Sequence, residues 1–297
     1  MIFYILYRIG QSMAMNFPLK FSYRVAVILA DIHYFLGFRE RRAVIENLKT
    51  ILPKSAEEAD IRSTAKDVFR NFAKYLVDFF RFSKMSPVYV KEFIKLEGLS
   101  NMEDALKYGK GVIMLSAHLG NWELGGFVLG TLGYPIHAVV LTHRHAKINE
   151  FFRNQRAMGK MRSIEFGASL RGCYKALKSN ELLALLGDRD FSNNGSLVTF
   201  CGKPVVMPRG PASLSYRTGA AIVPCFITRN GDDTFTFAFG KPILPDSGID
   251  KEAAIKSIME KYLPVVESYV KKYPGQWYVF RNFWNPSNEE LRTNTVI

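Results

Sequence analysis

Short apolar runs alternate with amphipathic segments from about residue 93 to near the end of the chain. After a strand-like segment that starts near Phe93, the apolar runs predict buried strands at 112–117, 136–141, 163–166, 182–187, 197–200, 221–227 and 233–239. The segments between them predict helices at 121–131, 146–160, 169–179, 209–218 and 251–272. This alternation favours an α/β fold with a mostly parallel central sheet flanked by helices on both faces.

The N-terminal part of the chain has a helical pattern and no strand pattern. Residues 1–53 predict two or three helices, and Ser55 is expected to cap a further helix that runs to about residue 83. We therefore divide the chain into an N-terminal helical, membrane-associating region, residues 1–90, and an α/β domain, residues 91–297.

Two N-terminal segments, 1–15 and 23–38, are rich in large apolar side chains, and Arg39, Arg41 and Arg42 follow the second. An apolar helix beside cations suits insertion at a membrane interface, although such helices can also simply pack on a core. No stretch reaches the roughly 20 uninterrupted apolar residues of a spanning helix. We therefore expect peripheral or monotopic contact with a membrane surface.

The net charge of +13 indicates an anionic partner: nucleic acid, an anionic membrane lipid or phosphorylated lipid, or an acidic carrier protein. Zinc-finger spacing, an RNA-recognition signature and a lysine-rich tail are all absent from the sequence, so we expect no nucleic acid. The three widely spaced cysteines indicate a reducing compartment without a disulfide framework.

The candidate chemistry centres on residues 111–126, which read GVIMLSAHLGNWELGG. A buried strand here runs through a glycine-containing turn into a helix, and places His118 in the turn and Glu123 in the first helical turn. His118 suits a general base, and Glu123 could reach its other ring nitrogen. The alternative is a hydrogen-bonded structural histidine at a strand end. Since Ser116 is expected to lie deeper in the sheet, the nucleophile would come from the substrate.

HLGNWE resembles the His-x4-Asp/Glu motif of the glycerolipid acyltransferase superfamily, and its GNWE form is similar to the lipid A biosynthesis (lauroyl/myristoyl) acyltransferase family. The resemblance implies that His118 deprotonates an acceptor hydroxyl, which attacks an acyl thioester, while Glu123 supports His118. It also implies acyl carrier protein as the donor, with acyl-CoA as the alternative, and a lipid A precursor as the acceptor.

Further blocks fit the same resemblance and supply candidate substrate-binding residues. Arg156 stands where the family keeps an arginine, and Asp188, at the end of the strand 182–187, matches its functional aspartate. Asp188 and Asp190 could also bind a metal or form an ion pair with Arg189, which departs from the family pattern. The remaining candidates are Asn121, Arg209 and Gly210, the last as a helix start whose backbone N–H groups could face an oxygen.

The C-terminal stretch YPGQWYVFRNFW also resembles the family, and we expect Trp277, Arg281 and Trp284 to close the domain. His143 and His145 share a strand face but lack a third ligand, so we expect no metal site, and no cofactor apart from the acyl donor. The resemblance therefore implies an O-acyltransferase, which we expect at the cytoplasmic face of a bacterial inner membrane. Alternatives are acyl transfer to a phosphatidylinositol mannoside or glycerophospholipid, a thioesterase, and a non-catalytic basic binding module. Acyl chain length and oligomeric state do not follow from the sequence.

Overall fold

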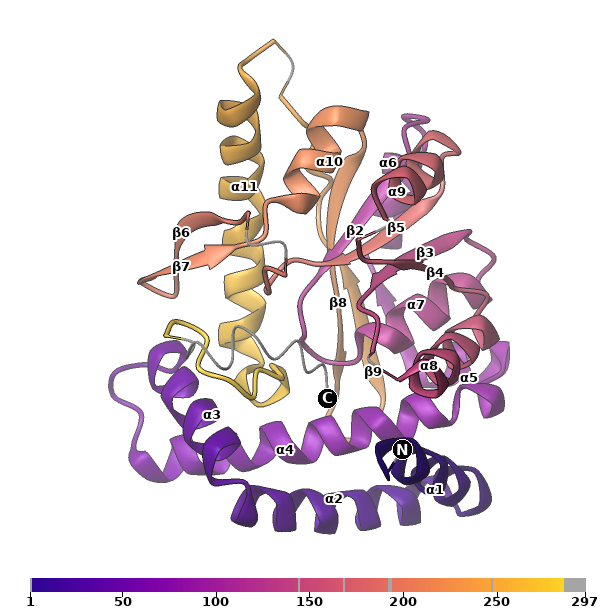
Figure 1. Ribbon diagram of the computed structural model, residues 1–297, viewed down its shortest axis with the longest axis vertical. Helices are drawn as coiled ribbons and strands as arrows, with labels where there is room; N and C mark the ends of the chain where they lie inside the picture. Colours follow the sequence, from indigo (N-terminus) through magenta and orange to yellow (C-terminus); the bar gives the residue numbers. More distant parts are fainter. Residues whose placement is uncertain (1, 144, 168, 192–193, 247, 286–297) are drawn as a thin grey trace.

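A seven-stranded sheet forms the centre of the part of the chain described by the computed structural model, residues 2–143, 145–167, 169–191, 194–246 and 248–285 (Figure 1). Its order is β1-β9-β8-β2-β5-β3-β4. The strands are β1 Ile94–Glu97, β9 Phe235–Phe239, β8 Ala221–Arg229, β2 Val112–Ser116, β5 Leu182–Leu186, β3 Ile136–Val140 and β4 Arg162–Glu165. The five strands from β8 to β4 are mutually parallel, β9 is antiparallel to β8, and β1 is parallel to β9. The predicted mostly parallel sheet is therefore confirmed.

Helices cover both faces of this sheet, as predicted. One face carries α6 Leu99–Leu106, α7 Trp122–Thr131 and α8 Ala146–Met158, and the other carries α9 Ser169–Lys178, α10 Gly210–Thr218 and α11 Lys251–Lys272. Side chains of β2 alternate between the two apolar cores: Val112 and Met114 belong to one, and Ile113 and Leu115 to the other. A strand buried on both faces reads as a continuous apolar run, which explains the VIMLS sequence of β2.

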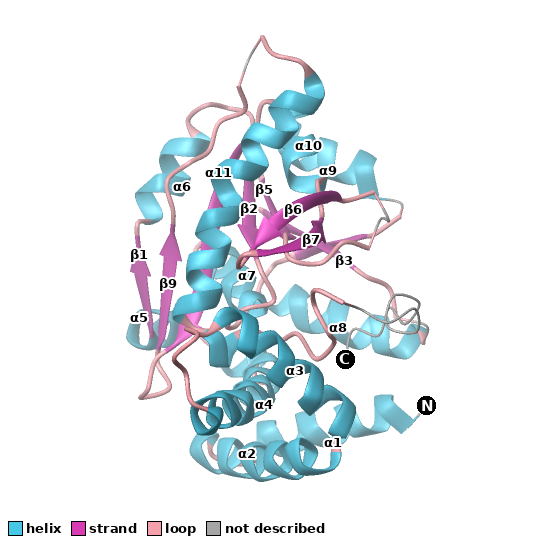
Figure 2. Ribbon diagram, turned by 90° about the vertical axis from the view of Figure 1, so that its left-hand side faces the viewer, coloured by secondary structure: helices cyan, strands magenta, loops and turns pink. Residues whose placement is uncertain are grey.

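The N-terminal helices form a layer at one end of the molecule (Figures 1 and 2). They are α1 Ile2–Asn16, α2 Leu19–Leu36, α3 Phe38–Ile51 and α4 Glu58–Phe80, followed by a 3-10 turn, Phe82–Lys84, and the short α5, Pro87–Phe93. Phe69 and Tyr75 of α4 share a core with Ile113 of β2, so this layer packs on the sheet domain. The expected cap at Ser55 is wrong, because α4 begins after Glu57 without a side-chain cap. The division at residue 90 stays a prediction.

Helices α1 and α2 expose many large apolar side chains. They are Ile2, Phe3, Ile5, Leu6 and Ile9 on α1, and Phe21, Ile28, Leu29, Ile32, Phe35 and Leu36 on α2. Within the described residues, no individual helix has the length and apolarity to cross a membrane. Helices α2 and α3 meet that test only as a pair bent by 92°.

A two-stranded antiparallel sheet stands beside the central sheet and was only half predicted (Figure 2). Its strand β6, Ser196–Phe200, corresponds to the predicted strand 197–200, but it pairs with β7, Lys203–Met207, and does not join the main sheet. A proline disfavours a strand, so Pro204 gives the sequence of β7 little strand character. The structure accommodates Pro204 because β7 has one partner strand and a free edge. The short helices α5 and α6 were also not predicted.

Candidate active site

Strand register brings His118 and Asp188 together. β2 and β5 are parallel neighbours in which Ser116 pairs with Leu186, and His118 and Asp188 each follow two residues later. The backbone N–H of Gly187 donates to the carbonyl oxygen of Ser116 at 2.8 Å, which continues the pairing beyond the strand ends. The two side chains therefore meet at the carboxyl edge of the sheet, where parallel α/β sheets place their ligands.

Asp188, rather than Glu123, holds the His118 ring. His118 Nδ1 lies 2.7 Å from Asp188 Oδ1, and the backbone N–H of His118 donates to Asp188 Oδ2 at 2.9 Å. Trp277 Nε1 donates to the same Oδ2 at 3.0 Å. Asp188 is 1% exposed and fully engaged, so the expectation that it binds substrate directly is wrong. These contacts leave Nε2 of His118 as the ring nitrogen available to a ligand.

The surroundings keep His118 neutral and Asp188 charged. Burial, assisted by the charges of Arg189 and Arg281, lowers the pKa of His118 in spite of the opposing effect of Asp188. Burial alone would raise the pKa of the Asp188 carboxyl, but His118 and Arg189 and the hydrogen bond from Trp277 together hold that pKa well below its usual range. A neutral imidazole with an ionised carboxylate on Nδ1 is the arrangement that a general base requires.

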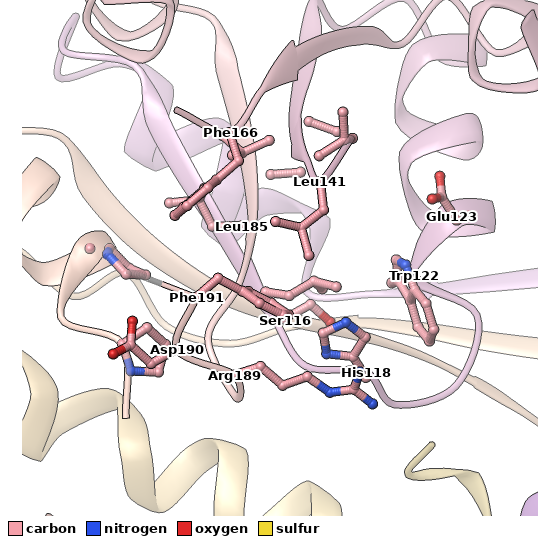
Figure 3. Close-up of a pocket in the computed structure, with 18 of the residues that line it drawn as sticks. Ser116, His118, Trp122, Glu123, Leu141, Phe166, Leu185, Arg189, Asp190 and Phe191 are labelled. Atoms are coloured by element: carbon pink, nitrogen blue, oxygen red, sulfur yellow. The ribbon is translucent and has the colours of Figure 1, made fainter. Parts of the chain in front are cut away.

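The prediction that Glu123 orients His118 is wrong. Glu123 sits in the first turn of α7 and forms a bidentate ion pair with Arg156 of α8, with Arg156 Nε 2.9 Å from Oε2 and Nη2 2.5 Å from Oε1. Figure 3 shows Trp122 between Glu123 and the His118 ring. Arg156 lines the same cavity as His118, but its charge is already matched by Glu123, so a role as a free phosphate ligand is not supported. The pair instead ties α7 to α8.

Asn121 shapes the turn and does not face a ligand. Its side chain is 2% exposed, accepts a hydrogen bond from the backbone N–H of Leu124 as the N-cap of α7, and donates to Asp78 of α4 at 2.9 Å. Its expected substrate-binding role is therefore wrong. Gly120 before it has φ +65°, and a Cβ there would lie 2.0 Å from the carbonyl oxygen of Ile227. Only glycine fits this turn, which explains the Gly-Asn pair.

A cavity of about 1330 Å³ opens beside His118. It exceeds the roughly 300–1,000 Å³ of ordinary small-molecule sites, so it has room for an elongated ligand or for two ligands. Leu141, Phe166 and Leu185 form part of its apolar wall, and Arg189 extends toward the His118 ring (Figure 3). Arg39 and Arg42 of α3 and Arg281 add positive charge to the wall. The cavity thus combines an apolar surface, a buried histidine paired with a carboxylate, and cations.

Arg189 lies beside His118 in the cavity wall. Its Nη2 donates to the carbonyl oxygen of Tyr278 at 2.6 Å, while its buried Nε has no hydrogen-bond partner among the described residues. Burial, partly offset by Asp188, lowers the pKa of Arg189 to about 10, so the guanidinium stays charged at neutral pH. Arg189 lines the cavity, and its role in binding substrate stays a prediction.

Arg209 and Gly210 also line the cavity, near its α10 side. Arg209 forms an ion pair with Glu252 of α11, so its charge is partly matched. Gly210 begins α10, as predicted, and a Cβ there would meet no atom within 4 Å.

The sequence analysis did not identify the site roles of two residues, Trp277 and Asp78. Trp277 was assigned only to closing the domain, yet it fixes the Asp188 carboxylate. Asp78, which is fully buried, contacts Tyr23, Asn121 and Arg229, and so links α2, α4 and β8 to the turn after His118. The available signal was a carboxylate inside the apolar run LVDFF of α4, because a buried charge needs a partner.

The chain is similar to several known proteins. The sequence profile described as "Bacterial lipid A biosynthesis acyltransferase" matches residues 1–285. The chain is 24% identical to a phosphatidylinositol mannoside acyltransferase of Mycolicibacterium smegmatis over 72% of this chain and 70% of that protein. It is 26% identical to a lipid A biosynthesis palmitoleoyltransferase of Escherichia coli over 83% of this chain and 80% of that protein. Among solved structures, the 1-acyl-sn-glycerophosphate acyltransferase of Thermotoga maritima matches with a TM-score of 0.41 and 14% identity, over 86% of this chain and 96% of that chain.

Proposed function

Because the chain belongs to the bacterial lipid A biosynthesis acyltransferase family and is an acyltransferase with a lipid acceptor, we propose that it moves a fatty acyl chain from acyl carrier protein to a hydroxyl of a phosphorylated glycolipid. A lipid A precursor is the acceptor that we favour. The observation that carries the proposal is the buried His118–Asp188 pair at the wall of a large, partly apolar and partly cationic cavity.

The proposed reaction uses Nε2 of His118 as the base. Nε2 takes the proton of the acceptor hydroxyl while the hydroxyl oxygen attacks the thioester carbonyl carbon, and Asp188 stabilises the imidazolium that forms. Collapse of the tetrahedral intermediate breaks the C–S bond, and the imidazolium returns its proton to the leaving thiolate. The reaction needs no protein nucleophile, because the acceptor hydroxyl attacks the thioester directly.

The cavity accounts for the two substrates. Its apolar wall suits a fatty acyl chain, because burying each methylene group contributes about 0.8 kcal/mol. The cations Arg189 and Arg281 beside His118 suit a phosphorylated acceptor or the developing oxyanion.

We place the enzyme at the cytoplasmic face of a bacterial inner membrane, bound peripherally or monotopically. The exposed apolar side chains of α1 and α2 support this location, since several hundred square ångströms of contiguous apolar surface marks an interaction site. Lys20 and Arg24 are also exposed on α2 and would meet anionic headgroups.

A second acceptor class has specific support. The phosphatidylinositol mannoside acyltransferase matches this chain about as well as the lipid A enzyme does, at 24% and 26% identity. Transfer to a mannoside or glycerophospholipid would use the same base and the same cavity. A thioesterase would use His118 to activate water instead of an acceptor hydroxyl.

Labelled acyl transfer distinguishes these activities. The purified enzyme in detergent receives labelled acyl carrier protein or acyl-CoA together with a phosphorylated glucosamine lipid, a phosphatidylinositol mannoside or a glycerophospholipid. We expect label in the glucosamine lipid, with the carrier protein as the better donor. Label in another lipid would retain the proposed chemistry and change the acceptor. Release of free fatty acid that continues when an acceptor lipid is added would indicate a hydrolase.

The pH dependence of transfer tests the electrostatics of the site. Since the pKa of His118 is held below its ordinary value of about 6.5, we expect log kcat/KM to fall only below that pH. Arg189→Gln removes a cation that lowers the pKa of His118, so the acidic limb should move to higher pH. Arg153→Gln, an exposed cation of α8, should leave the limb in place. An unmoved limb in Arg189→Gln would contradict the proposed influence of Arg189 on the base.

A further inference from the structure

A cluster of exposed cations covers the α9–α10 side of the molecule. Arg171, Lys175 and Lys178 follow one another on α9 at positions i, i+4 and i+7, and therefore form one stripe along the helix. Arg217, in the last turn of α10, and Lys110, in the turn before β2, are also exposed. We call these five residues the α9–α10 cation cluster.

The members of the cluster come from neighbouring elements. Arg217 Nη1 donates to Tyr174 Oη of α9 at 3.4 Å, across the gap between the two helices. The side chain of Lys110 runs past the end of α10, where a Cβ on Gly219 would lie 3.8 Å from Lys110 Cγ. The cluster is therefore one surface that spans both helices.

This positive charge has little internal compensation. In the described part of the chain, none of the five cations forms an ion pair. Among the elements packed nearby, Glu165 is exposed at the end of β4, and Glu181 contacts His137 at 2.6 Å and lies 4.0 Å from Arg162. Helix α11, which packs on α10, carries Glu252, Glu260 and Glu267, and these pair with Arg209, Lys256 and Lys271. A surface of this kind attracts a polyanion.

The same two helices line the cavity that contains His118. Leu170, Tyr174 and Arg217 belong to its wall, as does Phe166. Leu170 is 62% exposed and Phe166 is 41% exposed, so apolar side chains reach the surface beside the cations. The cluster thus lies next to an apolar opening of the catalytic cavity.

The opening lies far from the exposed apolar helices. Both views place α9 and α10 at the end of the molecule opposite α1 and α2 (Figures 1 and 2). If α1 and α2 rest on a membrane, the cation cluster faces the aqueous side, whereas Arg39 and Arg42 of α3 line the cavity nearer the membrane. The two ends of the cavity therefore suit two substrates of different origin: a lipid from the membrane and a soluble anionic donor.

We propose that the α9–α10 cation cluster is the docking surface for the acidic acyl carrier protein, and that the donor thioester enters the cavity beside Leu170 and Tyr174. The inference rests on the proposed function, in which the acyl donor is bound to a carrier protein and reaches His118 on the carrier's flexible arm. Charge complementarity between the α9–α10 cation cluster and the carrier protein steers the carrier and sets its affinity. The acyl-transfer step itself depends on His118 and Asp188.

Charge reversal tests the docking surface. The variant is Arg171→Glu/Lys175→Glu, and the matched control is Lys256→Glu/Lys272→Glu, which removes two exposed cations from α11. Three quantities are measured at low ionic strength: binding of the carrier protein without an acyl chain, kinetics with the acylated carrier, and kinetics with acyl-pantetheine, an uncharged donor without a protein. Sedimentation with anionic vesicles is measured in parallel.

We expect the α9 variant to bind the carrier about tenfold or more weakly, with a matching rise in KM and little change in kcat. Its kinetics with acyl-pantetheine and its vesicle binding should equal those of the control. Carrier affinity equal to that of the control would overturn the proposal, as would an equal rise in KM for acyl-pantetheine. Loss of vesicle binding alone would show that this face meets the membrane instead. Wild-type protein that binds the carrier but transfers no acyl group would contradict the proposed function and leave the docking surface standing.

Discussion

Asp188→Asn is expected to lower kcat for acyl transfer about 10²- to 10⁴-fold with the fold preserved. Oδ2 of Asp188 accepts two N–H groups, from the His118 backbone and from Trp277, so an amide at this position must place its oxygen there. The amide nitrogen then faces His118 Nδ1 and donates to it, which forces the ring proton onto Nε2. A protonated Nε2 cannot accept the proton of the acceptor hydroxyl. Steady-state kinetics and thermal unfolding check this expectation.

Glu123→Gln is the matched comparison for Asp188→Asn. Glutamine keeps the shape of Glu123 but removes the charge that neutralises Arg156, whose side chain is only 12% exposed, so the main effect should be on stability, of the order of 3 kcal/mol. We expect a lower Tm with a smaller loss of kcat than in Asp188→Asn. If Glu123→Gln instead lost kcat as severely as Asp188→Asn at an unchanged Tm, the assignment of Asp188 as the partner of the base would be wrong.

His118→Ala is expected to lower transfer by about 10²- to 10⁴-fold or more, because it removes Nε2, the base of the proposed reaction, at the cavity wall. The substitution enlarges a cavity that already exists, and His118 is 8% exposed at its wall, so the protein should stay folded. Circular dichroism and thermal unfolding verify the fold, and the labelled transfer assay measures the loss.

His137→Gln is the matched histidine control. His137 lies on β3 and contacts Glu181 at 2.6 Å, so it is a partly buried histidine with a carboxylate partner outside the proposed chemistry. It should keep nearly full activity. Near wild-type transfer by purified His118→Ala would refute the general-base mechanism, and His118→Gln provides a second variant if alanine disturbs the turn.

The sequence by itself determined the fold class and the place of His118. The run Val112–Ser116 predicted a buried parallel strand, and the turn after it placed His118 at the sheet edge, as the structure confirms. These features depend on local pattern: an apolar run, a glycine whose turn allows no Cβ, and an N-cap asparagine. The identity of the motif also pointed correctly to the family.

Only the tertiary structure decided which carboxylate contacts the His118 ring. Glu123 is five residues away along the chain and Asp188 is seventy, yet the β2–β5 register places Asp188 beside the ring, and the start of α7 turns Glu123 toward Arg156. The sequence indicates that parallel strands end at one edge, but it does not specify which strands are neighbours or how they are aligned. Those features depend on the packing of the whole sheet and its helices, which sets the distances between groups remote in the chain. The same reason applies to Asn121, which was a substrate-binding candidate from the sequence and instead donates to the buried Asp78 of α4.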